Sequence, residues 1–445
     1  MPVPPIRTKL VRPHLETAGM LAGIAACALI TLSARVAGAG DWPQFRGPDR
    51  NAISMETGLL REWPEGGPKV LWSVEACEGY AAAAVHSGRV YFNDYDKEAQ
   101  EWLVRCLDLR DGKELWRFRE KKRIRPNHGI TRTVPAVDGK VLFSMDPKCT
   151  FHALDAPTGK ELWQKNLVEE YGTVIPSWYT GQCPLLEGDR VLIAPGGRAL
   201  VVALEKATGK PIWESPNPDQ STMTHASVMP ATIDDVKQYL YCTLAGPVGV
   251  AADDGRILWS FPWKFNVAVP VSPLAVGRGL VFLTSCYEAE TVMIRVERSG
   301  EAFSATKVLS LTSAEWNSET HTPIVYENHI FAVGKKKRGL FTCLDLQGNA
   351  VWTSEGEATF GLGSYILADG MFFVLEGDTG LLRLLEANTK EYRELASAQV
   401  LQGHDVWAPL ALSDGKLLVR DMTKMVCLDV VGPHGGAAGD LSAGQ

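Results

Sequence analysis

The stretch ALDAPTGKELW, residues 153–163, decides the fold because variants of it return along the whole chain. It joins a Leu-Asp step, a polar turn ending in Gly159, and a tryptophan. The glycine can take the positive φ that a tight hairpin needs, and the polar residue before it can bond the local backbone. The sister phrases are CLDLRDGKELW at 106–116, ALEKATGKPIW at 203–213, a degenerate GVAADDGRILW at 249–259, and CLDLQGNAVW at 343–352.

The tryptophans set the period of the repeat. Trp72, Trp116, Trp163, Trp213 and Trp259 are spaced by 44, 47, 50 and 46 residues, and the 93-residue gap to Trp352 holds two periods with one tryptophan lost. Short strands at this period are typical of propeller blades. Helical solenoids share the period, but the runs between the phrases are rich in β-favouring residues and are bounded by glycine turns.

Eight innermost strands are predicted. Six begin at a proline and two, near Ala83 and Ser364, do not; the prolines are Pro135, Pro184, Pro230, Pro273, Pro323 and Pro409. The last unit, 416–430, ends before any tryptophan, and its missing outer strand is found at 70–74. We therefore predict an all-β, eight-bladed β-propeller whose ring is closed by the N-terminal strand joining the C-terminal blade, which leaves no free sheet edge.

The tryptophans are predicted to dock one blade against the next. An indole buries on the order of 200 Å², which is worth several kcal/mol at about 25 cal/mol/Å². The docking residues expected from the repeat are Trp72, Trp116, Trp163, Trp213, Trp259 and Trp352.

Residues 1–39 are predicted to be a secretory signal. They hold a basic start, an apolar stretch and a small-residue cleavage site, at 7–12, 18–34 and 37–39. Two alternatives stay open. Cys27 could be lipidated, because residues 24–27 resemble a lipoprotein processing site. The segment could also remain as an uncleaved anchor, because the apolar stretch is only slightly shorter than the roughly 20 residues of a membrane helix. We expect an exported protein of the periplasm or cell envelope that meets a membrane only through such an N-terminus.

The rest of the chain divides into three predicted parts. A leader covers residues 40–67, the propeller covers 68–431, and 432–445 is a glycine-rich tail that we expect to be disordered. Because one propeller absorbs the repeats, the length of 445 residues does not require several domains.

The net charge argues against nucleic acid as the main partner. The chain carries −7, and the signal region holds four basic residues and one acidic residue, so its removal leaves −7 − 3 = −10. Basic clusters at 117–125 and 335–338 fall in predicted turns, where a solvated loop is the simplest interpretation.

Eight of the nine cysteines lie beyond the predicted signal, and an exported protein could pair them. The repeat argues otherwise, because Cys106, Cys343 and Cys427 fill the position that Ala153 and Ala203 take in sister phrases. That position needs a small buried side chain, which a free cysteine supplies. We expect most thiols to be structural and unpaired.

The repeat resembles the tryptophan-docking motif of the quinoprotein alcohol dehydrogenase superfamily, and residues 68–430 resemble its smaller eight-bladed members with PQQ-like repeats. That branch includes the BamB type of outer-membrane assembly lipoprotein. The leader DWPQFRGP at 41–48 is similar to the segment that opens many exported PQQ-like repeat proteins. The resemblance implies a fold and leaves the chemistry open.

Propellers place ligands in a funnel around the axis, lined by the loops that lead into the innermost strands. Polar and aromatic residues recur in these loops, and four of the histidines fall in equivalent ones. The candidates are His128, Arg132, Trp178, Tyr179, His225, Asn266, Glu319, His321, His404, Asp405 and Trp407. Three interpretations stay open for them: exposed loops without a task, a shared ligand site, or a histidine metal site, which a wide funnel disfavours.

The resemblance raises the question whether the funnel holds pyrroloquinoline quinone with calcium. Dehydrogenases of this superfamily are longer, and many carry an adjacent cysteine pair that this chain lacks. Their calcium ligands are Glu, Asn and Asp, residue types that Glu319, Asn266 and Asp405 offer without matching a motif. We expect no cofactor and assign no metal ligand or catalytic residue. Cys-x-x-Cys-His, His-Glu-x-x-His and Gly-x-Ser-x-Gly motifs are missing from the sequence as well.

Three functions follow as hypotheses. The first is a non-catalytic scaffold outside the cytoplasm that offers its funnel or rim to a protein or polymer partner. The second is a quinone-dependent alcohol or sugar dehydrogenase. The third is an extracellular carbohydrate binder that stacks sugars on Trp178, Tyr179 and Trp407.

Overall fold

The structure, a computed structural model, describes residues 1, 40–125, 127–263, 268–334 and 339–432. The predicted signal peptide and tail, the basic cluster at 335–338 and the candidate Asn266 lie outside these residues. Within the described part, no helix is both long and apolar enough to span a membrane.

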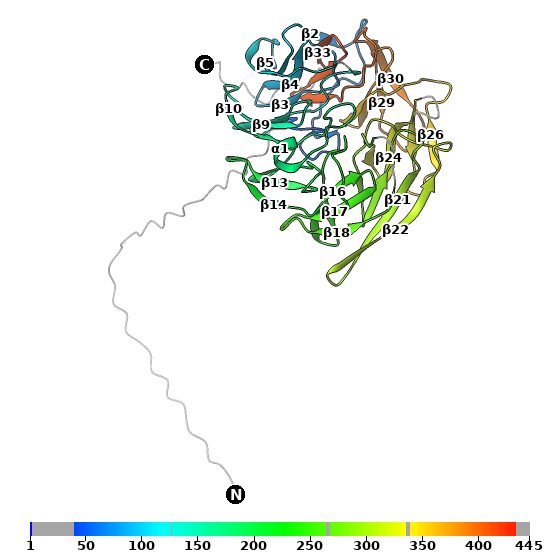
Figure 1. Cartoon of the computed structure of the whole chain (residues 1–445). Helices are drawn as coiled ribbons and strands as arrows, with labels where there is room; N and C mark the ends of the chain where they lie inside the picture. Colours follow the sequence, from blue (N-terminus) through cyan, green and yellow to red (C-terminus); the bar gives the residue numbers. More distant parts are fainter. Residues whose placement is uncertain (2–39, 126, 264–267, 335–338, 433–445) are drawn as a thin grey trace, which may run out of the picture. The chain divides into compact units, whose positions relative to one another are not determined.

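Eight β-sheets stand around one axis (Figure 1), so the prediction of an all-β, eight-bladed propeller is confirmed. We number the blades along the chain from their innermost strands. The strands are, in blade 1, β3 (Ala84–His86), β4 (Arg89–Asp96), β5 (Glu101–Asp108) and β6 (Glu114–Lys121); in blade 2, β7 (Ala136–Val137), β8 (Val141–Met145), β9 (Thr150–Asp155) and β10 (Glu161–Asn166); in blade 3, β11 (Leu185–Glu187), β12 (Arg190–Ile193), β13 (Val202–Glu205) and β14 (Pro211–Glu214); in blade 4, β15 (Met229–Ile233), β16 (Val236–Thr243), β17 (Gly246–Ala251) and β18 (Ile257–Ser260); in blade 5, β19 (Leu274–Gly277), β20 (Leu280–Leu283), β21 (Thr291–Ser299) and β22 (Ala302–Leu311); in blade 6, β23 (Ile324–Tyr326), β24 (His329–Gly334), β25 (Leu340–Leu344) and β26 (Ala350–Thr353); in blade 7, β27 (Tyr365–Ala368), β28 (Met371–Leu375), β29 (Leu381–Glu386) and β30 (Glu394–Gln399); and in blade 8, β31 (Ala411–Ser413), β32 (Lys416–Arg420), β33 (Lys424–Asp429) and β2 (Lys69–Glu75).

Two of the described elements do not belong to this repeat: a short helix in blade 2 and a short strand of the leader. A single helical turn, α1 (Leu167–Tyr171), begins at Asn166, whose side chain accepts two backbone N–H bonds, and ends at Gly172 with φ of 71°. The short strand β1 (Ile53–Ser54) of the leader pairs in parallel with β27 and makes blade 7 five-stranded.

The repeat phrase forms the same local structure in the blades that carry it. The tryptophan pairs across the two outermost strands with the small side chain that the sequence places there, as in Trp116 opposite Cys106 and Trp163 opposite Ala153. A β-bulge follows directly and shifts the register. Because the small residue leaves room, the indole lies over the sheet. In the described residues no disulfide links the eight cysteines, and all of them but Cys77 are buried.

The indoles also contact the following blade. Trp116 Nε1 donates to the Ala156 carbonyl of blade 2 at 3.0 Å, and a Cβ added to Gly159 would lie 2.4 Å from the same indole. The glycine of the turn is therefore required twice, for its φ of 74° and for this close approach. The same bond to a carbonyl of the next blade is made by Trp72, Trp163, Trp213 and Trp352.

Trp259 departs from this pattern. Its Nε1 donates to Gln238 Oε1 of its own blade at 2.6 Å. The reason lies in blade 5, where β21 and β22 form a long hairpin that replaces the Leu-Asp and glycine turn. The tryptophan missing from blade 5 is replaced by Leu309, which packs where a Cβ on Gly348 of blade 6 would lie 2.9 Å away.

Blade 8 takes its outer strand from the N-terminal side of the chain. The strand β2 pairs antiparallel with β33, and Trp72 lies opposite Cys427. Arg420 of β32 reaches from this blade to blade 1, where its Nη2 donates to the Cys77 carbonyl at 2.7 Å and its Nη1 to the Ala81 carbonyl at 2.9 Å. Its side chain therefore ties the last blade to the first.

The leader runs beneath the ring of inner strands. Trp42 exchanges backbone hydrogen bonds with Val85 of β3, and the Pro43 carbonyl accepts from Val137 of β7. Further along, Glu56 accepts the backbone N–H of Gly415 at 2.6 Å, after β31. These contacts join the leader to the neighbouring blades 8, 1 and 2.

Two arginines of the leader are fully enclosed. Arg46 Nη2 donates to the Pro323 carbonyl of blade 6 at 2.8 Å, and its Nη1 to the Thr322 carbonyl. Arg50 donates from Nη1 to the Pro184 carbonyl of blade 3 at 2.6 Å. Because these carbonyls lie just before the innermost strands β23 and β11, the two side chains tie the leader to blades 6 and 3.

Candidate functional site

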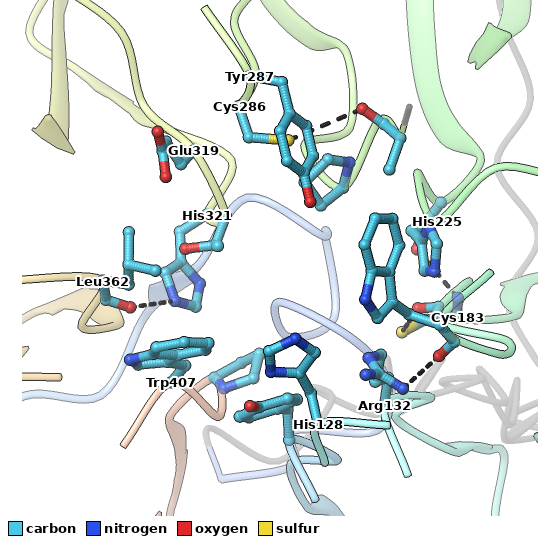
Figure 2. A pocket seen from close by; sticks show the side chains of 18 of the residues that line it. His128, Arg132, Cys183, His225, Cys286, Tyr287, Glu319, His321, Leu362 and Trp407 are labelled. Carbon is cyan, nitrogen blue, oxygen red and sulfur yellow. Dashed lines mark hydrogen bonds between the residues drawn. The ribbon is translucent and has the colours of Figure 1, made fainter. Parts of the chain in front are cut away.

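A cavity of about 670 Å³ lies on the axis, above the leader. Its walls come from the loops that lead into the innermost strands, and Figure 2 shows side chains from several blades turned toward its centre. Most of its surface is apolar. A concave, mostly apolar space with few polar groups is the usual form of a ligand site.

Seven of the eleven side chains predicted for the funnel are brought together in this wall: His128, Arg132, Trp178, His225, Glu319, His321 and Trp407. Tyr179, His404 and Asp405 lie outside it. The Tyr179 hydroxyl donates to the Arg125 carbonyl at 2.8 Å, and His404 is 80% exposed, with Nδ1 3.5 Å from Asp405 Oδ2. Three of the four equivalent histidines therefore share one cavity, while a role in binding stays a prediction for all of them.

Sequence reasoning missed several residues of the wall, among them Phe45, Tyr80, Tyr287 and Asn317. Tyr80 lies in the loop that leads into β3, and the rule applied to the other blades would have found it there even without a proline. Tyr287 belongs to the β20–β21 loop, a different loop type that opens on the same side. Phe45 comes from the leader, whose path no repeat predicts.

Two stacked aromatic pairs stand in the wall. Trp407 and Tyr80 are 5.2 Å apart between ring centroids at an interplanar angle of 13°, and Trp178 and Tyr287 are 6.1 Å apart at 17°. Tyr287 is 56% exposed, so this pair is open to solvent on one side. Each pair holds a broad flat face in place, and such faces suit an aromatic or apolar group.

His225 and His321 of the wall are neutral at physiological pH. Burial, together with the smaller effect of the nearby Arg132, lowers the pKa of His225 to about 4. Burial also lowers the pKa of His321 to about 4, with Arg46 adding to the effect. Because His321 Nε2 lies 3.1 Å from the Leu362 carbonyl, which can only accept, its proton sits on Nε2. These rings offer hydrogen bonds and carry no charge.

Arg132 supplies a positive charge to the wall. Its Nη1 donates to the Trp178 carbonyl, its guanidinium lies 5.6 Å from the Tyr80 ring centroid, and burial lowers its pKa to about 10. The group stays protonated at neutral pH. It also fixes the Trp178 loop against the Tyr80 ring.

The backbone of the wall loops is left-handed at bulky residues. Values of φ are 57° at His128, 66° at Tyr179, 55° at Tyr287 and 53° at Asp405. Residues other than glycine and asparagine rarely adopt this conformation, and it persists where the surrounding structure enforces it. The loops are therefore held in defined shapes that set which side chains enter the cavity.

The cavity wall holds one of the two candidate calcium ligands that the structure describes. Of the three candidate calcium ligands, Glu319 lies in the wall, Asp405 lies outside it, and Asn266 is beyond the described residues. Among the His, Cys, Asp and Glu side chains of the described residues, three approach closely enough to share an ion: Glu120, Asp146 and His152, between blades 1 and 2. That cluster already surrounds an ammonium group, because Lys122 Nζ lies 2.7 Å from Asp146 Oδ2 and 3.0 Å from Glu120 Oε1.

The His152 cluster predicts a pH-dependent contact between blades 1 and 2. The buried ring lies 2.8 Å from Glu161 Oε1 through Nδ1 and 3.2 Å from Glu120 Oε2 through Nε2. Burial lowers the pKa of His152, but bonds to Asp146 and Glu161 and the charges of Asp146 and Glu120 outweigh it, so the pKa is raised. A raised pKa stabilises the fold fully below the unfolded value of about 6.5, and this stabilisation is lost as pH rises through the folded pKa.

We expect His152→Gln to lower the free energy of unfolding by about 1–3 kcal/mol at pH 6 and by less at pH 8.5, because the ion pairs exist only with the charged ring. Urea unfolding at the two pH values measures the difference. His329→Gln, on β24 away from this cluster, is the control and should change stability little at either pH. Equal losses at both pH values for His152→Gln would contradict the charged ring.

A family model described as outer membrane protein assembly factor BamB matches residues 100–260 and 179–394, which together cover more than half of the chain. The chain belongs to this BamB family of PQQ-like repeat propellers. The resemblance stated from the repeat is thereby confirmed. Among functionally curated proteins, no match to the chain was found.

Solved structures share the fold of this BamB-family chain at low identity. BamB from Moraxella catarrhalis has a TM-score of 0.57 at 14% identity, over 81% of this chain and 97% of that one. A europium-containing methanol dehydrogenase has a TM-score of 0.61 at 13% identity, over 88% of this chain and 89% of that one. The quinohemoprotein alcohol dehydrogenase ADHIIG from Pseudomonas putida HK5 has a TM-score of 0.60 at 13% identity, over 92% of this chain and 82% of that one. The fold is thus common to an assembly factor and to enzymes.

Proposed function

We propose that this protein is a non-catalytic binding scaffold of the cell envelope, and that its central cavity receives an aromatic or apolar segment of a protein partner. The observation that carries the proposal is the cavity wall, which holds two stacked aromatic pairs on a mostly apolar surface. Membership of the family described as an assembly factor supports a protein as the partner.

The charges of the wall favour binding over catalysis. A general base works best with a pKa near the operating pH, and both His225 and His321 have a pKa lowered to about 4. Of the three residues considered as calcium ligands, Glu319 is the one that belongs to the wall in the described part of the chain. A sugar-binding site would need more hydrogen-bonding groups than this apolar surface offers.

The first test uses the fluorescent probe 8-anilinonaphthalene-1-sulfonate. We expect one binding site, weakened roughly 10- to 100-fold in the double variant Trp178→Ala/Trp407→Ala, since each aromatic face contributes about 1–1.5 kcal/mol. Both side chains are half-buried in loops, so their loss should leave the blades intact. Tyr326→Ala, a half-buried aromatic outside the cavity, is the matched control and should bind the probe normally.

Competition then separates the three functions. Displacement of the probe by a tryptophan- and phenylalanine-rich peptide supports the scaffold. Stoichiometric uptake of pyrroloquinoline quinone with calcium, together with reduction of a dye by an alcohol or sugar, would replace it with a dehydrogenase. Displacement by cellohexaose and not by the peptide would replace it with a carbohydrate binder.

A further inference from the structure

The closed end of the cavity is built by the leader. Phe45 is one of the lining residues, and the others come from the blades and their loops. The Arg50 guanidinium lies 5.5 Å from the Phe45 ring centroid and bonds carbonyls of blade 3, so the ring is fixed from behind. Any group that enters the cavity fully must end on this segment.

Positive charge gathers at this end. Arg46 donates to the Arg50, Asn51, Thr322 and Pro323 carbonyls. Arg50 donates to the Cys183 and Pro184 carbonyls and to the Gln44 side chain. In the described structure these partners are neutral oxygens, and burial lowers the pKa of both arginines to about 10. Both stay protonated at neutral pH without a carboxylate to offset them.

The acids of the wall do not cancel this charge. Glu288 is exposed, so water and salt screen it. Glu319 is half-buried and supplies one negative charge. Arg132 in the wall and the two arginines of the leader supply three positive charges. Because a buried charge acts through a lower dielectric than an exposed one, the deep part of the cavity has a positive potential.

We propose that the leader selects the ligand: Phe45 contacts its deepest group, and Arg46, Arg50 and Arg132 favour an aromatic group that carries a negative charge. This inference rests on the proposed function, because it names the chemistry that the same cavity takes. The ligand chemistry is an aromatic ring next to a carboxylate, which a peptide end or a small aromatic acid would both present.

Three probes with the same ring test the charge. Indole-3-acetate, indole-3-acetamide and tryptamine carry −1, 0 and +1 at neutral pH, and calorimetric titration measures their affinities. We expect indole-3-acetate to bind at least roughly tenfold more tightly than tryptamine, with the amide between them. Arg132→Gln should narrow this difference. Tryptamine binding as tightly as indole-3-acetate would overturn the charge selection.

Phe45→Ala tests the contact. We expect it to weaken all three probes about tenfold and to leave their order unchanged, because it removes a neutral surface. Phe45→Leu retains the apolar volume if alanine disturbs folding, and should weaken binding less. Phe303→Ala on β22, outside the cavity, is the matched control. Normal binding by both Phe45 variants would overturn the proposed contact between Phe45 and the deepest group of the ligand.

Failure of this inference differs from failure of the proposed function. If Trp178→Ala/Trp407→Ala binds every probe as the wild type does, the cavity is not the binding site at all. If that variant loses binding while the Phe45 variants do not, the cavity binds and the leader does not select. A tripeptide ending in tryptophan with a free carboxylate identifies a peptide source when it binds more tightly than indole-3-acetate.

Discussion

Replacement of Arg420 by alanine is expected to lower the free energy of unfolding by about 3–5 kcal/mol, because it removes a buried charge whose hydrogen bonds join blade 8 to blade 1. The side chain is 2% exposed and donates to the Cys77, Ala81 and Asn93 carbonyls. Burial lowers its pKa, which indicates that the guanidinium is held there by these contacts against the cost of desolvation. Urea unfolding followed by circular dichroism measures the loss.

Two variants control this result. Arg420→Lys keeps the charge, but an ammonium group cannot bond several carbonyls in the planar arrangement of a guanidinium. We expect a loss in the free energy of unfolding between that of Arg420→Ala and none. Arg393→Ala removes a 59% exposed arginine paired with Glu386 and should cost less than about 1 kcal/mol. If Arg420→Ala costs no more than Arg393→Ala, the seam between blades 8 and 1 is held by other contacts.

Replacement of Trp213 by alanine is expected to cost about 3–5 kcal/mol, the range for removing a large buried aromatic side chain. The indole is 8% exposed and donates to the Ala252 carbonyl of blade 4 at 3.2 Å. It also packs on Gly255, where an added Cβ would lie 2.4 Å from the ring. The loss therefore leaves a cavity between two blades, and the melting temperature should fall with it.

Ile212→Ala is the matched control for Trp213. It precedes the tryptophan on the same strand and is 43% exposed, so its loss should change stability by about 0.5 kcal/mol or less. Trp163 is only half-buried, so its replacement should cost less than that of Trp213. A small effect at Trp213 would show that the indoles do not hold the blades together.

The blades could be predicted because their signals are local. The Leu-Asp step, the turn glycine and the tryptophan lie within eleven residues, and the hairpin they form brings Trp163 opposite Ala153 without help from distant residues. The prolines used to predict the starts of the innermost strands are well placed: Pro135 and Pro184 come directly before β7 and β11. Trp259 bonds a side chain of its own blade, and the glycine turn that the other indoles meet in the next blade is replaced in blade 5 by a long hairpin.

The cavity could be predicted only in part. The loop rule placed His128, His225 and His321 together, since equivalent loops of a ring face one axis. It could not tell that His404 turns outward, because the direction depends on the backbone at Asp405, where φ is 53°. Nor could it give the neutral state of His225, since its lowered pKa comes from burial among residues of other blades.

The sequence by itself determined the number and form of the blades, because a short repeat contains the turn, the small position and the indole that each blade needs. Tertiary structure alone decided the closed end of the cavity. The leader has no repeat and no regular pattern, and its arginines bond the carbonyls of Pro184 and Pro323, which come near each other only once the ring places blades 3 and 6 around the same axis. Hydrogen-bond partners more than a hundred residues away cannot be inferred from local sequence, and the completed ring is what creates them.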